Sequence, residues 1–259
     1  MSFQYEKNLN FQIASDLHIE YKNDLVPDPL LYINPVCDIL ILAGDIGSFY
    51  KINQLEEFLK KICKLFKTVI YVPGNQEFYT ISNIEPLPLN ILVKRMYDIE
   101  NNIDNLLILN RSSVIIKNIC ITGCTLWSDV KIKIPKFIVR IHGMNNNIYK
   151  NKYDNDVKYI NKMIEHCANN NLKLIVVTHY CPTYKVLDGS KKHDKYVSLY
   201  ASNLDNLLSS SNIHTWICGH VHKNFDFVTK EGTRVVGNQS GKEKDNIQDY
   251  SKEFMVEII

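Results

Sequence analysis

Long hydrophobic runs and a strong excess of charge are both absent from this 259-residue sequence. No stretch is apolar over the roughly 20 residues that a membrane-spanning helix needs. The first ten residues, MSFQYEKNLN, lack the apolar core of a secretory signal. The formal net charge of +2 creates no strong field that would favour nucleic acid or an anionic membrane. We therefore expect no membrane partner, and nucleic acid is disfavoured as a partner without being excluded.

A disulfide framework is also missing, because the seven cysteines are odd in number and scattered along the chain. Cys120 and Cys124 form a C-x3-C pair, but no second Cys/His pair completes a zinc site. Most cysteines lie in apolar segments, so we expect reduced, buried thiols and a soluble protein of a reducing compartment such as the cytoplasm. Internal repeats, low-complexity tracts and flexible linkers are absent as well. Residues 1–259 are therefore predicted to form a single domain.

Short apolar runs bounded by turn signals dominate what is present. The segment Asp38–Gly47, DILILAGDIG, contains a continuous apolar run that ends at Gly44-Asp45. Such a run is typical of a strand buried on both faces of a sheet. Five strands of this kind are predicted, at Phe11–Ser15, Ile39–Ala43, Thr68–Val72, Leu174–Thr178 and Ile213–Cys218. Helical spacing of apolar residues separates some of them, which favours a layered α/β fold.

The remaining segments predict the outer parts of the fold. Helices are expected at Ile52–Phe66, Pro86–Glu100, Asp154–Asn169 and, as a short one, Leu199–Leu208. The pieces between Leu106 and Cys124, and the tail segments Phe225–Val228, Thr233–Val236 and Glu253–Ile258, are interpreted as antiparallel strands. Ser128–Lys152 and Tyr180–Tyr196 are interpreted as irregular excursions. Two packed sheets with helices outside would accommodate these elements.

A polar cluster follows each of the five buried strands. The side chains that carry chemistry there are Asp16, His18, Asp45, Asn75, His179, His220 and His222. One such residue alone is usually a cap or a satisfied histidine, but five clusters in order are hard to obtain by chance. Imidazole and oxygen donors together suit Zn, Mn or Fe and contain too much nitrogen for Ca. Seven ligands exceed one tetrahedral ion, so we expect two ions with Asp45 as the shared ligand.

These clusters resemble the five blocks of the calcineurin-like metallophosphoesterases, in a small bacterial-type branch. The matching segments are D-L-H at Asp16, G-D at Gly44, G-N-Q-E at Gly74, T-H at Thr178 and G-H-V-H at Gly219. The resemblance implies a four-layer αββα sandwich of two mixed β-sheets flanked by helices. It also implies hydrolysis of a phosphomonoester, phosphodiester or nucleotide-type phosphate by a hydroxide that bridges two divalent ions. These ions would be Mn, Fe, Zn or Ni.

Carried over residue by residue, the resemblance divides the ligands into two sets. One ion would be held by Asp16, His18, Asp45 and His222, and the other by Asp45, Asn75, His179 and His220. The catalytic residues would be Asp45, Asn75 and Gln76.

Gln76 departs from the family pattern, which has histidine at this position. That histidine usually contacts the phosphoryl group and helps to protonate the leaving oxygen, whereas glutamine has no titratable proton. General acid catalysis contributes roughly 10²–10⁴-fold. The substitution therefore leaves three outcomes open: a slower hydrolase, one restricted to activated substrates, or a metal-binding scaffold. A nuclease is less favoured because the chain has no obvious basic stripe.

Other residues are candidates for contacts with a small phosphorylated substrate. Arg140, His142 and His193 lie in the two irregular excursions, which could fold over the metals. A solvated basic face is the competing interpretation for the lysines and arginine there. His214 lies within an apolar strand and is interpreted as structural, and Trp127 is expected to pack beneath the site.

Overall fold

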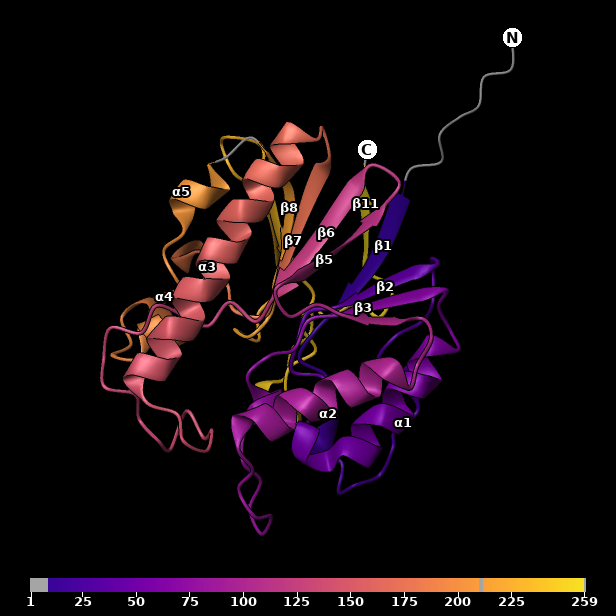
Figure 1. Cartoon of the computed structure of the whole chain (residues 1–259), viewed down its shortest axis with the longest axis vertical. Helices are drawn as coiled ribbons and strands as arrows, with labels where there is room; N and C mark the ends of the chain where they lie inside the picture. Colours follow the sequence, from indigo (N-terminus) through magenta and orange to yellow (C-terminus); the bar gives the residue numbers. More distant parts are fainter. Residues whose placement is uncertain (1–8, 210–211, 259) are drawn as a thin grey trace.

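Two β-sheets face each other in the computed structural model, which describes residues 9–209 and 212–258. Figure 1 shows the sheets as two layers, with helices on the outer side of each. The four-layer αββα arrangement predicted from the resemblance is therefore confirmed. That residues 1–259 form one domain stays a prediction.

The first sheet has five strands and is parallel except at one edge. Its order is β11 (Met255–Ile258), β1 (Leu9–Ala14), β2 (Ile39–Leu42), β3 (Thr68–Tyr71) and β4 (Leu106–Ile108). The strand β11 pairs antiparallel with β1. The parallel register aligns the carboxyl ends of β1, β2 and β3, since Ala14 pairs with Leu42 and Leu42 with Tyr71.

The second sheet has six strands, and both of its edges are antiparallel. Its order is β5 (Ser112–Ile116), β6 (Ile119–Cys124), β7 (Lys173–Thr178), β8 (Ile213–Ile217), β10 (Arg234–Gly237) and β9 (Phe225–Val228). The four central strands are parallel, and the pairs β5–β6 and β9–β10 are antiparallel. The carboxyl ends of β7 and β8 consequently lie at one edge of this sheet.

Helices cover the outer faces of both sheets. Figure 1 shows α1 (Ile52–Cys63) and α2 (Leu89–Asn101) on the first sheet, and α3 (Asn146–Asn169) on the second. The short helices α4 (Gly189–Lys192) and α5 (Asp205–Leu208) lie on the side of α3. None of the described helices combines the length and the apolar character that crossing a bilayer requires.

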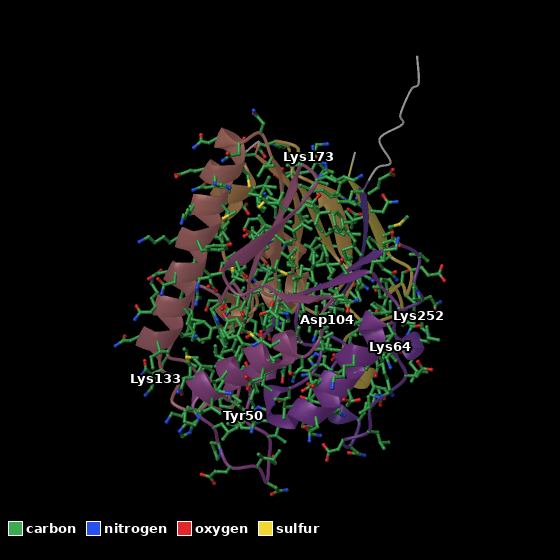
Figure 2. All side chains as sticks on the ribbon, turned by 45° about the vertical axis from the view of Figure 1, so that its right-hand side comes forward. Tyr50, Lys64, Asp104, Lys133, Lys173 and Lys252 are labelled. Carbon is green, nitrogen blue, oxygen red and sulfur yellow. The ribbon has the colours of Figure 1, made fainter. Side chains whose placement is uncertain are left out.

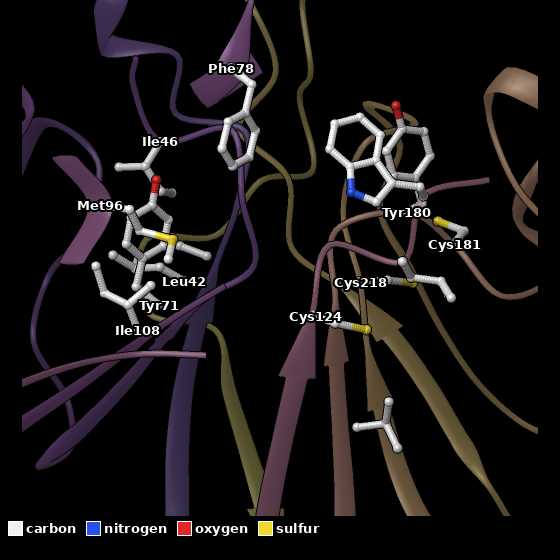
Figure 3. Packing of buried hydrophobic residues seen from close by; sticks show 14 of the residues in the cluster. Leu42, Ile46, Tyr71, Phe78, Met96, Ile108, Cys124, Tyr180, Cys181 and Cys218 are labelled. Carbon is white, nitrogen blue, oxygen red and sulfur yellow. The ribbon is translucent and has the colours of Figure 1, made fainter. Parts of the chain in front are cut away.

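The core explains why β2 is apolar at every position. Ile39 and Ile41 of β2 belong to the apolar cluster that both sheets share, whereas Leu40 and Leu42 belong to the cluster that includes the helices. Figure 3 shows part of the cluster that includes the helices, with Leu42 and Met96 on one side and Cys124 and Tyr180 on the other. Charged side chains such as Lys133 and Lys252 lie at the periphery instead (Figure 2).

Three predictions of local structure are wrong. The strand β4 pairs parallel with β3 in the first sheet, so it is not part of an antiparallel hairpin region. The helix α3 begins at Asn146, whose preceding residue Asn145 caps it by accepting from the backbone N–H of Ile148. The predicted excursion 128–152 therefore ends in helix. The segment between 199 and 208 is helical only at its two ends.

Candidate metal centre

The ends of five parallel strands position the seven predicted ligands. Asp16 and His18 follow β1, Asp45 follows β2 and Asn75 follows β3. From the second sheet, His179 follows β7, and His220 and His222 follow β8. The two sheets are joined here by a bridge between Ser15 and Gln239. Ligands far apart in the sequence thus converge at one edge of the sandwich.

Left-handed backbone is concentrated among these ligands. The φ angles of Asp16, His18, Asp45, His220 and His222 are 57°, 52°, 54°, 73° and 48°. Each such residue costs about 1–2 kcal/mol, so the surrounding structure must hold it. It does so by hydrogen bonds between the loops, because Asp16 N donates to Gly44 O at 2.9 Å and His18 N donates to Asp45 O at 3.0 Å. The strained turns aim the side chains at a common point.

Asp16, His18 and His222 form the first group of donor atoms. His18 Nε2 lies 3.0 Å from His222 Nε2, and His222 Nε2 lies 3.3 Å from Asp16 Oδ1. Asp16 is held in turn by Ser15 Oγ, which donates to its Oδ2 at 2.5 Å. One donor atom from each of the three residues lies within 4.8 Å of the others.

Asp45, His179 and His220 form the second group, with Asn75 beside it. His179 Nε2 lies 3.3 Å from Asp45 Oδ1, 3.2 Å from His220 Nδ1 and 3.0 Å from Asn75 Oδ1. One donor atom from each of Asp45, His179 and His220 lies within 4.8 Å of the others.

Asp45 lies between the two groups. Its Oδ1 faces His179, while its Oδ2 lies 4.0 Å from His18 Nε2 of the first group. A carboxylate with one oxygen toward each group has the placement of a ligand shared by two cations.

Each of the four histidines among the predicted ligands has a hydrogen-bond acceptor at its outer ring nitrogen, the one that faces away from the cluster. His18 Nδ1 donates to Glu20 Oε1 at 3.0 Å, and His222 Nδ1 donates to Asp245 Oδ2 at 2.5 Å. The other acceptors are backbone carbonyls: His179 Nδ1 donates to Ala43 O and His220 Nε2 to Leu199 O, at 2.9 and 3.0 Å. Metal-ligating histidines almost always make such bonds, which fix the ring and leave the inner nitrogen free to bind.

The charges of the cluster are strongly coupled. Burial lowers the pKa of His220 to about 3, and neighbouring His179 adds to the shift. Burial also opposes the charge on His179, but Asp45 outweighs it and raises the pKa of His179 to about 10. The pKa of Asp45 is lowered by His179 and His18 despite its burial. The centre therefore stabilises positive charge close to Asp45, and divalent cations supply such charge.

Glu77 ties the loops of the second group together. Its carboxylate accepts from the backbone N–H groups of Asp45, Ile46 and Gly74 at 3.1, 2.7 and 2.8 Å, and from Tyr71 Oη at 2.6 Å. Burial raises the pKa of Glu77 to about 8, and the charge of Asp45 contributes. Glu77 lies within the G-N-Q-E block, but its contacts with three backbone N–H groups are not evident from that motif.

The donor set fits two divalent cations. The inner donors are 3.0–3.3 Å apart within each group. Neighbouring ligands at about 2.1 Å from a common ion are separated by about this much. Four imidazoles, two carboxylates and one amide oxygen are a mixture that transition metals accept.

Two cavities adjoin the cluster. A cavity of about 370 Å³ reaches Asn75, Gln76 and His220, and one of about 550 Å³ reaches His18. Arg140 lines the smaller of the two, and its guanidinium lies 5.5 Å from the centre of the Tyr79 ring. His142 and His193 are exposed and line neither cavity.

Trp127 and His214 are both placed by packing. Trp127 is buried against the rings of Phe78, Tyr149 and Tyr180, and Tyr180 lies 4.0 Å, centre to centre, from His220. His214 is half-buried on β8, away from the cluster, with Nδ1 2.8 Å from Thr215 Oγ1.

Comparison with known families decides what this centre belongs to. A family model described as calcineurin-like phosphoesterase matches residues 9–224, which contain all seven predicted ligands. The chain belongs to the calcineurin-like phosphoesterases. It is accordingly a metal-dependent phosphoester hydrolase with a dinuclear divalent metal site.

Relatives of this phosphoesterase span most of its length. An uncharacterised protein of Acanthamoeba polyphaga mimivirus is 26% identical over 268 residues, which cover 92% of this chain and 94% of that protein. The solved structure of the phosphopantetheinyl hydrolase of Mycobacterium tuberculosis superposes with a TM-score of 0.65 at 14% identity, covering 97% and 96% of the two chains. A dimetal phosphatase of Danio rerio gives a TM-score of 0.52 at 11% identity, covering 88% and 86%.

Parts of the phosphoesterase centre lie outside the matched residues. Asp245, the acceptor for His222, comes 23 residues after its partner, and no periodicity or motif in the sequence indicates this contact. Glu20, the acceptor for His18, lies only two residues after its partner. Neither Glu20 nor Asp245 is among the site residues predicted from the sequence.

Proposed function

We propose that this phosphoesterase hydrolyses small phosphate esters whose leaving groups are stable anions. The observation that carries the proposal is the position of Gln76. Its backbone N–H donates to Asp45 Oδ1 at 2.8 Å, and the residue lines the cavity that also reaches Asn75 and His220. A residue without a titratable proton thus occupies the wall nearest the second group of ligands.

The buried tyrosines and the histidine of this cavity are poor substitutes for a general acid. Burial raises the pKa of Tyr79 and of Tyr180 well above the ordinary value, so neither hydroxyl is a good proton donor at neutral pH. His220 is the one histidine that lines the cavity, and its inner nitrogen belongs to the cluster. Esters that need no protonation of the leaving oxygen would suffer least from this arrangement.

Different residues of the chain would bind the metals and orient the phosphate. We assign the metals to Asp16, His18, Asp45, Asn75, His179, His220 and His222, with Mn, Fe, Zn and Ni as candidates. When bound, two such ions lower the pKa of a water to about 7 and neutralise charge on the phosphoryl group. Asn75 and Gln76 would orient phosphoryl oxygens, and Arg140, which lines the same cavity, would add a guanidinium.

A small phosphorylated molecule is the proposed partner. The cavities are of the size that takes small ligands, and the chain's net charge is only +2. One structural neighbour is a phosphopantetheinyl hydrolase, and the phosphopantetheinyl group is small and contains phosphate. These observations favour a small substrate over a nucleic acid.

Restoring histidine at position 76 tests the proposal. We expect Gln76→His to raise the rate for alkyl phosphate esters by about 10²–10⁴-fold and to change the rate for 4-nitrophenyl esters much less. The matched control is Gln76→Asn, which keeps an amide and should give no gain. Rates are measured with Mn, Fe, Zn and Ni in turn, after the bound metal has been quantified.

The competing role is that of a metal-binding scaffold, which the missing acid at position 76 also favours. It would be supported if the protein binds its metals fully, yet neither wild type nor Gln76→His hydrolyses any ester. A similar rate gain for both leaving groups would instead contradict the restriction to stable anions.

A further inference from the structure

Two cavities open onto the proposed centre, and they share one wall. The aromatic cavity, of about 370 Å³, reaches the second ligand group through Asn75 and His220. The loop cavity, of about 550 Å³, reaches the first ligand group through His18. Tyr21, Lys242 and Lys244 line both cavities, so the two cavities lie side by side, each next to one ligand group.

The aromatic cavity suits a planar substituent. Tyr79, Tyr196, Tyr200 and Phe137 contribute rings to its lining. Phe137 is 72% exposed, and its ring lies 6.3 Å from that of Tyr196. These two rings come from the two excursions of the chain and are available to stack on a flat group.

The loop cavity is built differently, by the segment 240–247 facing Leu17 and Tyr32. The segment is anchored at both the surface and the centre, because Lys22 forms an ion pair with Glu243 and Asp245 accepts from His222. It follows the residues matched by the family model, which end at 224. Ile247 adds an apolar side chain to a wall that also contains lysines. One wall of this cavity therefore comes from the tail of the chain, which is fixed to the predicted ligand His222.

We propose that the substrate is a phosphodiester whose two substituents occupy the two cavities. The leaving substituent would lie in the aromatic cavity beside Gln76, and the retained substituent in the loop cavity beside His18. Lys242 and Lys244, in the shared wall, would face the anionic phosphate. A monoester would fill only one of the two spaces. The proposal rests on the proposed function, since it assumes that the phosphate lies at the metal centre.

The reaction would consume one water and release two products. The water oxygen forms the new bond to phosphorus, and the bond from phosphorus to the leaving oxygen breaks. The leaving group keeps that electron pair and departs as an anion, while the protons of the water pass to solvent. The retained substituent leaves as a phosphomonoester.

A pair of substrates with the same leaving group tests the inference. Bis(4-nitrophenyl) phosphate and 4-nitrophenyl phosphate both release 4-nitrophenolate, and only the diester has a second substituent. We expect the wild-type kcat/KM for the diester to exceed that for the monoester by about tenfold or more. Ile247→Trp, which fills the loop cavity, should reduce the diester-to-monoester ratio of kcat/KM by about tenfold. Phe137→Ala should lower kcat/KM for both substrates.

Ile115→Trp serves as the control, because Ile115 is 53% exposed on β5 and lines neither cavity. It should leave both rates as they are in wild type. A wild-type preference for the monoester, or an equal effect of Ile247→Trp on the two substrates, would overturn the inference while leaving the proposed function intact. Absence of metal-dependent turnover on both substrates would instead contradict the proposed function. Thermal melting of each variant shows that a changed ratio does not come from unfolding.

Discussion

At the scale of single residues, the centre depends as much on the acceptors behind the ligands as on the ligands themselves. The outer nitrogen of each of these imidazoles is hydrogen-bonded to a carboxylate or a carbonyl. This bond fixes the orientation of the other ring nitrogen, which faces the cluster. The ordered blocks of sequence predict the ligands, and the structure brings these residues together. The blocks do not predict the acceptors, since Leu199 and Ala43 accept through backbone carbonyls that any residue at these positions would supply.

Replacing Asp245 tests the importance of such an acceptor. We expect Asp245→Asn to weaken the binding of one of the two metal ions by about 10–100-fold, because His222 loses a charged partner. Isothermal titration of the metal-free protein measures both affinities. Asp226→Asn is the control, since Asp226 pairs with Arg234 away from the centre. Equal affinities in Asp245→Asn and wild type would show that His222 needs no partner.

Glu77 offers a second test, of stability. In Glu77→Gln the amide keeps one oxygen but turns an N–H₂ group toward backbone N–H donors, so buried donors are left without an acceptor. We expect the free energy of unfolding in the presence of a chelator, at a pH above 8 where Glu77 is ionised, to fall by about 2–3 kcal/mol. Urea unfolding provides the value, and Glu57→Gln, in an exposed ion pair with Lys60, should change it little. A small effect at both positions would refute the role given to Glu77.

At the scale of elements, strand ends from two sheets approach so closely that side chains are excluded between them. A Cβ atom on Gly74 would lie 2.6 Å from Asp45 N and would also overlap the Asp45 carboxylate. One on Gly219 would lie 2.6 Å from Asp16 Oδ2. The glycines of the G-N-Q-E and G-H-V-H blocks are thus required by the packing of the loops.

Gly74→Ala should therefore disturb the centre even though alanine is small. We expect the free energy of unfolding to fall by about 1–3 kcal/mol, since the overlap involves backbone that cannot move aside. Metal affinity should fall as well, because Asp45 is displaced. Gly189→Ala is a matched control in open space at the start of α4, where alanine should raise stability by about 0.5–1 kcal/mol. The comparison is made by urea unfolding, and similar changes in the two variants would contradict the close approach.

The sequence predicted these elements unevenly, for physical reasons. Buried strands such as β2 and β7 were predicted because both of their faces are covered and they contain the continuous apolar runs Ile39–Leu42 and Leu174–Val177. The partner of β4 was not, because a short apolar run carries no information about which strand it pairs with. The start of α3 was missed because its first turns are rich in Asn, Lys and Tyr and lack a clear apolar stripe.

At the scale of the whole molecule, the cysteines contribute to the packing of the core and are not among the predicted site residues. All seven are free thiols, six are buried, and Cys37 is half-buried. Burial raises the pKa of Cys63 and of Cys167 to about 12. A reducing compartment stays a prediction that this pattern favours.

We expect Ellman's reagent to modify one thiol per native chain quickly, that of Cys37, and all seven after unfolding without a reductant. Buried thiols react slowly because their thiolate form is disfavoured and the reagent cannot reach them. Cys37→Ser should remove the fast reaction. Fewer than seven thiols in the unfolded chain would reveal a disulfide, and several fast thiols would contradict the packing described for the core.

The most direct test of the central claim is to count metal ions and turnover in the same samples of wild type and Asp45→Asn. Wild type should bind two divalent ions per chain and hydrolyse a 4-nitrophenyl ester, and a chelator should abolish the activity until metal is restored. Asp45→Asn should lose activity by about a hundredfold or more, since even partners behind the ligands are worth about 10–100-fold. Fewer than two ions at saturation in wild type, or undiminished turnover in Asp45→Asn, would contradict a pair of cations joined by this carboxylate.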